Sequence, residues 1–95
     1  MTKISEAKLT KMITSHLKRS GVFFWKTSDR YTSGVSDIVG CFKGKFFAIE
    51  IKATGKKARN LQIYFIEQVK LNGGATLITD NFPLFLQFMD ALDEI

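Results

Sequence analysis

Apolar and polar residues follow a helical period in three stretches of this chain. Between about Ser5 and Ser20, residues of the inner stripe recur three or four positions apart, which predicts an amphipathic helix ending at Gly21. A second helix is expected from Asn60, a good cap, to about Leu71, and a third from Pro83 to about Leu92. The expected inner residues are Leu9, Met12, Ile13, His16 and Leu17 in the first helix, and Leu61, Tyr64, Phe65 and Val69 in the second, with Gln68 near the same stripe.

Four shorter runs are rich in β-branched and aromatic residues and predict strands: 22–25, 38–42, 45–52 and 75–79. The first run is expected to be a buried strand. Lys43-Gly44 separates the second and third runs and predicts a two-residue hairpin loop. The resulting order, α-β-β-β-α-β-α, predicts one α/β domain over residues 1–95, with a small mixed sheet and flanking helices.

The predicted hairpin places its polar residues on one face. If Phe42 pairs with Lys45, Asp37 lies opposite Glu50, and strand alternation brings Lys52 to the same face. The other face is uniformly apolar and is expected to pack against a helix; it comprises Ile38, Phe42, Phe47, Ile49 and Ile51. A one-residue slip in the turn would move Asp37 to that apolar face.

Two carboxylates opposite each other repel unless something compensates their charge. A Mg²⁺ ion would do so, since it is typically held by one or two carboxylates together with water and phosphate oxygens. The alternative is a solvated strand end with a lysine between two acids. Spacing alone leaves both interpretations open.

The order of several short motifs resembles one nuclease family. They are Gly34-Val35-Ser36-Asp37, then Glu50-Ile51-Lys52, then Gln62 at the start of the next helix, and Gly73-Gly74 after it. This pattern is similar to the VRR-NUC (virus-type replication-repair nuclease) branch of the PD-(D/E)XK nuclease superfamily, over roughly Ser5 to Thr79. The chain departs from the family at Ser36, which is often proline there; that residue is not a ligand.

The resemblance implies a role for each matching residue. Asp37, Glu50 and the Ile51 backbone carbonyl would bind Mg²⁺ or Mn²⁺. Lys52 would orient or deprotonate the attacking water, or stabilise charge on the scissile phosphate. Gln62 would contact the site or a phosphate. Glu6 matches the acidic residue of the family's first helix, although an acidic residue is also favoured there by the helix dipole.

The charge of the chain agrees with a nucleic-acid partner. Its 95 residues carry a net charge of +5, which favours a polyanion, although many proteins that bind no nucleic acid are equally basic. Lys56, Lys57 and Arg59 follow the third strand closely and could contact DNA phosphates; the alternative is a solvated loop.

Other chemistries are not indicated. Cys41 is the one cysteine, and a buried inert thiol is expected; His16, the one histidine, is expected to be partly buried without catalytic duty. The sequence therefore offers no zinc site of paired cysteines and histidines. It has no glycine-rich phosphate loop, and no apolar stretch approaches the roughly 20 residues that span a bilayer.

These observations predict a Mg²⁺- or Mn²⁺-dependent DNA endonuclease. The alternatives are a DNA-binding module on the same fold without turnover and an interaction domain with no role in nucleic acid. Resemblance to stand-alone nucleases of the Holliday junction resolvase type implies branched or four-way DNA, a homodimer and a cytoplasmic setting in a bacterium or phage-infected cell. Spare apolar residues for the dimer are expected on the last helix: Phe82, Leu84, Phe85, Leu86, Phe88, Met89 and Leu92. The alternative is that this helix packs all round against the sheet and the first helix.

Overall fold

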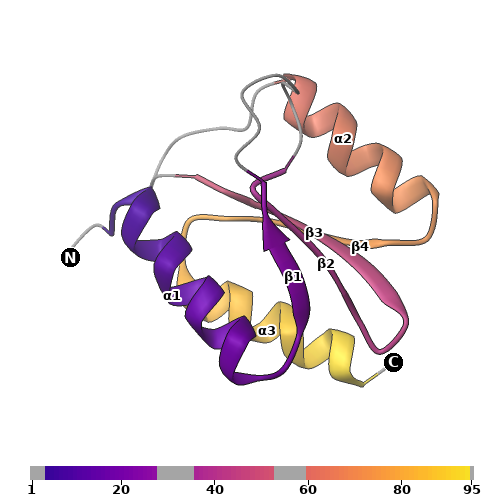
Figure 1. Cartoon of the computed structure of the whole chain (residues 1–95). Helices are drawn as coiled ribbons and strands as arrows, with labels where there is room; N and C mark the ends of the chain where they lie inside the picture. The colour runs from indigo at the N-terminus through magenta and orange to yellow at the C-terminus, as the bar shows by residue number, and fades with distance from the viewer. Residues whose placement is uncertain (1–3, 28–35, 53–59, 95) are drawn as a thin grey trace.

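The computed structural model describes residues 4–27, 36–52 and 60–94. Their helices and strands follow the predicted order (Figure 1). They are α1 (Glu6–Arg19), β1 (Phe23–Lys26), β2 (Ile38–Phe42), β3 (Lys45–Ile51), α2 (Asn60–Leu71), β4 (Ala75–Thr79) and α3 (Phe82–Asp93). The predicted fold class, a small mixed α/β domain core, is confirmed.

The four strands form one sheet in the order β1-β2-β3-β4. The first two pairs are antiparallel, whereas β4 runs parallel to β3. A parallel neighbour requires a crossover, and α2 supplies it between β3 and β4. As a result, the carboxyl ends of β3 and β4 lie at the same end of the sheet.

The hairpin between β2 and β3 forms as the sequence predicts. Phe42 pairs with Lys45, and the ladder continues to Ile38 opposite Ile49. Lys43 and Gly44 have φ of 53° and 82°, the positive values that a tight type I′ turn requires at both central positions. The turn therefore fixes the register that the site depends on.

The two faces of the sheet are covered by different helices (Figure 1). On one face, α1 and α3 enclose the main core, which contains Ile38, Phe47, Ile49 and Ile51 as predicted, with Phe42 packed at its edge. Helix α1 contributes Leu9, Ile13 and Leu17, which are four residues apart and all buried. On the other face, Ile66 of α2 packs against Val39 and Ala48.

Three burial predictions are wrong, and all concern the face that α2 covers only in part. Phe23 and Trp25 of β1 are 67% and 60% exposed, because β1 is an edge strand that α2 does not reach. Cys41, which pairs with Phe23 and Phe46, is exposed because α2 does not cover this part of the sheet either. Leu61, Tyr64 and Gln68 are exposed on α2, whose buried residues are Gln62 and Ile66. Phe65 and Val69 pack against the sheet as predicted.

Helix α3 has little apolar surface to spare. Phe85, Met89 and Leu92 are buried, while Phe82, Leu86 and Phe88 are partly buried against the same core. Leu84 is the one large apolar residue of this helix that is strongly exposed, at 42%. The expected surplus on the last helix is therefore absorbed by the core, apart from Leu84.

His16 is half-buried, as expected, and packs edge-on against Phe82 and Phe85. Within the described ranges, no helix has the length and apolar character needed to cross a bilayer.

Candidate metal centre

Asp37 and Glu50 meet where the hairpin opens. One step beyond the Ile38–Ile49 pair, the register places Asp37 opposite Glu50, as the sequence predicts. The Asp37 carboxylate reaches across to β3, where its Oδ2 accepts a hydrogen bond of 2.6 Å from the Ile51 backbone N–H. The side chain thus replaces a backbone partner that β2 no longer offers at this point.

The backbone of Asp37 is held from the other side by Thr27, directly after β1. The Thr27 N–H donates to the Asp37 carbonyl at 2.8 Å, and its hydroxyl lies 3.1 Å from the same oxygen. The hydroxyl also donates to the Ser36 carbonyl. Sequence reasoning missed this residue, because a threonine in a polar segment gives no sign of its distant partner.

Glu50 is the most unusual residue of the site, because it carries a carboxyl group and is nevertheless fully buried, with 0% of its surface exposed. Its Oε1 accepts a hydrogen bond of 3.0 Å from Nε2 of Gln62, itself only 6% exposed. Gln62 lies in the first turn of α2, the end of a helix that favours negative charge. A carboxylate is rarely buried without a compensating charge or hydrogen-bond donors.

Ile51 and Lys52 complete the end of β3. The Lys52 N–H donates to the Thr79 carbonyl at 2.9 Å, so this N–H faces β4. Backbone groups of successive strand residues point to opposite sides, and the Ile51 N–H accordingly faces Asp37. The Ile51 carbonyl points the same way as the Ile51 N–H, to the β2 side on which Asp37 lies. Alternation also returns the half-buried Lys52 side chain to the face of Glu50.

Two other predicted groups lie further out or outside the described residues. Glu6 is exposed in the first turn of α1, at the end of the molecule where β3 ends (Figure 1). Lys56, Lys57 and Arg59 lie outside the described residues. The hydrogen bonds above therefore form two pairs, Asp37 with Ile51 and Gln62 with Glu50. The pairs are adjacent because Glu50 and Ile51 are consecutive residues of β3.

The donor set at this point consists of oxygen atoms. Over residues 4–27, 36–52 and 60–94, no group of three or more His, Cys, Asp or Glu side chains could hold a metal ion. A cation between Asp37 and Glu50 would need the Ile51 carbonyl as its third protein ligand. Two carboxylates and a carbonyl suit a hard cation such as Mg²⁺ or Mn²⁺, whose remaining positions water and phosphate fill.

Comparison with known proteins supports the fold independently. No model of a known protein family matches the sequence, and no curated protein matches it. A solved structure described as a VRR_NUC domain matches with a TM-score of 0.77 and 18% sequence identity, covering 90% of this chain and 94% of that one. The chain therefore has the fold of that VRR_NUC domain.

Proposed function

We propose that this protein is a divalent-metal-dependent DNA endonuclease that hydrolyses phosphodiester bonds. The observation that supports this most is the fully buried Glu50 carboxylate next to Asp37 at the open end of the hairpin. A structural role alone would be served better by apolar residues, since burying a charge costs free energy that packing does not return. A metal centre gives both carboxylates a function.

Asp37, Glu50 and the Ile51 carbonyl are the proposed ligands of Mg²⁺ or Mn²⁺. When bound, such a cation supplies a Lewis acid for the phosphoryl oxygens and activates water for attack. Gln62 holds the Glu50 carboxylate in place through its 3.0 Å hydrogen bond. Asp37 is fixed at both ends, by Thr27 at its backbone and by Ile51 at its carboxylate.

Lys52 is the proposed residue for proton handling or charge stabilisation. A protonated lysine cannot ligate a cation, but it can donate hydrogen bonds to the scissile phosphate or orient the attacking water. Glu6 is proposed as an outer acidic residue of the same site. Lys56, Lys57 and Arg59 are proposed contacts to the DNA backbone.

The runner-up function is a DNA-binding module without turnover. Retention of Asp37, Glu50 and Lys52 together favours the enzyme, because binding DNA phosphates requires neither carboxylate. The third reading, an interaction domain with no nucleic acid, leaves the buried carboxylate without a purpose.

The proposed substrate is branched DNA, such as a four-way junction, cut by a homodimer in the cytoplasm of a bacterium or a phage-infected cell. A two-fold junction needs two symmetric cuts, and a C2 dimer provides two sites in that relation. The exposed apolar residues Phe23, Trp25 and Phe46 lie on the same sheet face as Glu50. We therefore place the proposed dimer contact on this face.

A cleavage panel tests the proposal. Labelled linear duplex, nicked, flap and four-way DNA are incubated with the protein in Mg²⁺, Mn²⁺ or EDTA. The proposal predicts cleavage with either cation and none in EDTA, with the four-way or flap substrate cut faster than the duplex. Salt-sensitive binding without any cleavage would instead support the non-catalytic module.

A further inference from the structure

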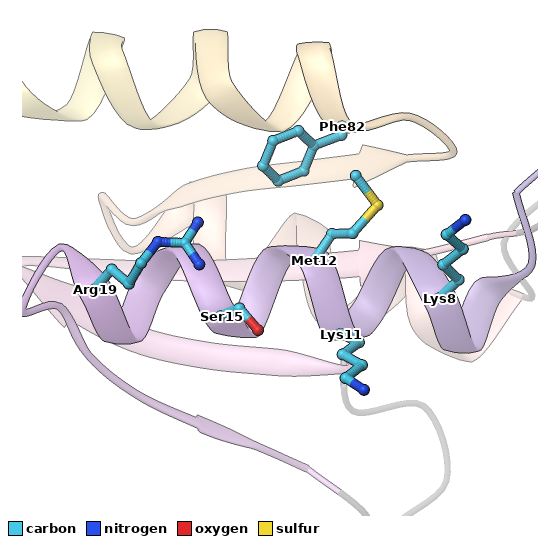
Figure 2. Close-up of a pocket in the computed structure, with 6 residues that line it drawn as sticks. All are labelled: Lys8, Lys11, Met12, Ser15, Arg19 and Phe82. Carbon is cyan, nitrogen blue, oxygen red and sulfur yellow. The ribbon is translucent and has the colours of Figure 1, made fainter.

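A groove with a cationic rim lies along α1 (Figure 2), and α1 covers the sheet face opposite α2 (Figure 1). Its volume is about 400 Å³, and it lies between α1 and the start of α3. The lining residues are Lys8, Lys11, Met12, Ser15 and Arg19 of α1, with Phe82 of α3.

The groove combines an apolar floor with positive charge. Met12 and Phe82 approach one another across it, and Phe82 is held by ring contacts with His16 and Phe85. The cations Lys8, Lys11 and Arg19 are exposed, and none of the described lining residues is acidic. In Figure 2, Lys8 and Arg19 flank the floor at its two ends, while Lys11 extends on the opposite side of α1 from Phe82.

The spacing of these cations suits a phosphate backbone. From Lys8 to Arg19 the helix rises roughly 16 Å, at about 1.5 Å per residue. One DNA strand presents a phosphate about every 3.4 Å along the duplex axis, so this length spans roughly five phosphates. Arginine and lysine side chains commonly donate hydrogen bonds to DNA phosphates in such contacts, and Ser15 adds a hydroxyl group that can do the same.

The groove also has a defined relation to the candidate metal centre. Helix α1 turns back into β1 through Ser20–Val22, and β1 runs in the same direction as β3, since both are antiparallel to β2. The start of α1 therefore lies at the end of the sheet where Glu50 is found. The groove leads away from that end along the sheet face opposite α2.

We propose that this groove binds the phosphate backbone of a second DNA arm, one that diverges from the arm being cut. A straight duplex placed across Glu50 on the α2 side would not also follow α1 on the opposite side. A branched DNA has a second arm that can. This inference rests on the proposed nuclease function and adds a specific site for the branched substrate.

The test compares two charge-matched double variants. Lys8→Gln with Arg19→Gln removes two cations from the groove, while Lys18→Gln with Lys70→Gln removes two exposed cations outside it. Both pairs lower the net charge equally and preserve helix propensity. Circular dichroism checks that both fold as the wild type does. Binding to a four-way junction and to a linear duplex is then measured at about 50 to 300 mM salt. Ca²⁺ replaces Mg²⁺ if the DNA is cleaved in Mg²⁺, so that binding is measured on intact DNA.

We expect the groove variant to bind the junction roughly 10- to 60-fold more weakly at 0.1 M salt, with a log–log salt slope about two units shallower. Its duplex binding should change no more than that of the control variant. If the groove variant bound the junction as tightly as the control variant does, the proposed role of the groove would be overturned. The same holds if the groove variant lost as much affinity for duplex as for the junction. In either case wild-type cleavage would leave the nuclease proposal standing, whereas a wild type that neither binds nor cleaves DNA would overturn both.

Discussion

At the scale of single residues, Gln62 is the side chain that holds the buried Glu50 carboxylate in position. Its Nε2 donates to Glu50 at 3.0 Å from the first turn of α2. Gln62→Leu keeps the approximate size but removes the donor, which should destabilise the fold by about 1–3 kcal/mol. We also expect Mn²⁺ affinity to fall by about 10- to 100-fold, because residues that orient ligands tune metal binding.

Calorimetric Mn²⁺ titration and urea unfolding measure these two effects of Gln62→Leu. Gln68→Leu is the matched control, since Gln68 is exposed on the same helix. A Gln62→Leu protein with the Mn²⁺ affinity of the control would show that Gln62 only fills space.

Lys52 is predicted to separate metal binding from turnover. Lys52→Met removes the ammonium group while keeping much of the side-chain length, so cleavage should drop by at least 100-fold. Mn²⁺ affinity should stay within a few-fold of wild type, because a protonated lysine is not a ligand. Lys70→Met, at an exposed position of α2, provides the control for charge. Loss of Mn²⁺ binding together with cleavage would contradict this division of roles.

At the scale of elements, Gly40 is the position where β2 permits the close approach of its neighbours. A Cβ there would lie 2.4 Å from the Phe23 carbonyl oxygen and 2.6 Å from Cζ of Phe47. Since one of these atoms is backbone, Gly40→Ala should destabilise the protein by about 1–3 kcal/mol.

Urea unfolding of Gly40→Ala tests this, with Cys41→Ala as the control at the next, exposed position. The control should stay within about 0.5 kcal/mol of wild type. Equal stabilities for the two variants would mean that Phe23 of β1 and Phe47 of β3 do not lie as close to Gly40 as described.

The elements that sequence could predict are those set by local chemistry. Lys43-Gly44 determines the hairpin turn, and the turn determines that Asp37 faces Glu50. Burial was harder to predict, because it depends on where a distant helix lies. Trp25 is apolar enough for a core, yet α2 packs on Val39 and Ala48 and leaves β1 uncovered.

The candidate site was predictable to a similar extent. Asp37, Glu50 and Lys52 follow from strand alternation, whereas the burial of Glu50 and its bond to Gln62 require the crossover of α2 over the sheet. Thr27 could not be found, since its contacts with Ser36 and Asp37 join residues nine and ten positions apart. The groove on α1 could not be predicted either, because only the position of Phe82 makes the cations of this helix the rim of a groove.

At the scale of the whole molecule, exposed apolar side chains gather on the face that also contains Glu50. If this face forms the proposed dimer, Trp25→Lys should give a monomer at micromolar concentration, because an ammonium group would be buried in the contact. Wild type should have twice the mass of the 10.8 kDa chain.

Light scattering distinguishes this face from the last helix. Leu84→Lys alters the one large apolar residue of α3 that is strongly exposed, and this variant should remain dimeric. A monomeric Leu84→Lys protein with a dimeric Trp25→Lys protein would move the contact to α3. A monomeric wild type would remove the dimer but leave a simpler endonuclease.

The most direct test of the metal centre is the rate of four-way DNA cleavage by wild type, Asp37→Asn, Glu50→Gln and the control Glu67→Gln, each with Mg²⁺ or EDTA. Glu67 is an exposed carboxylate on α2. We predict cation-dependent cleavage by wild type and Glu67→Gln, and at least a 100-fold loss in Asp37→Asn and Glu50→Gln. Their metal-free melting temperatures should stay level or rise, since the repulsion between the carboxylates is relieved. Cleavage by Glu50→Gln near the wild-type rate, or equal cleavage in EDTA, would contradict the proposed site.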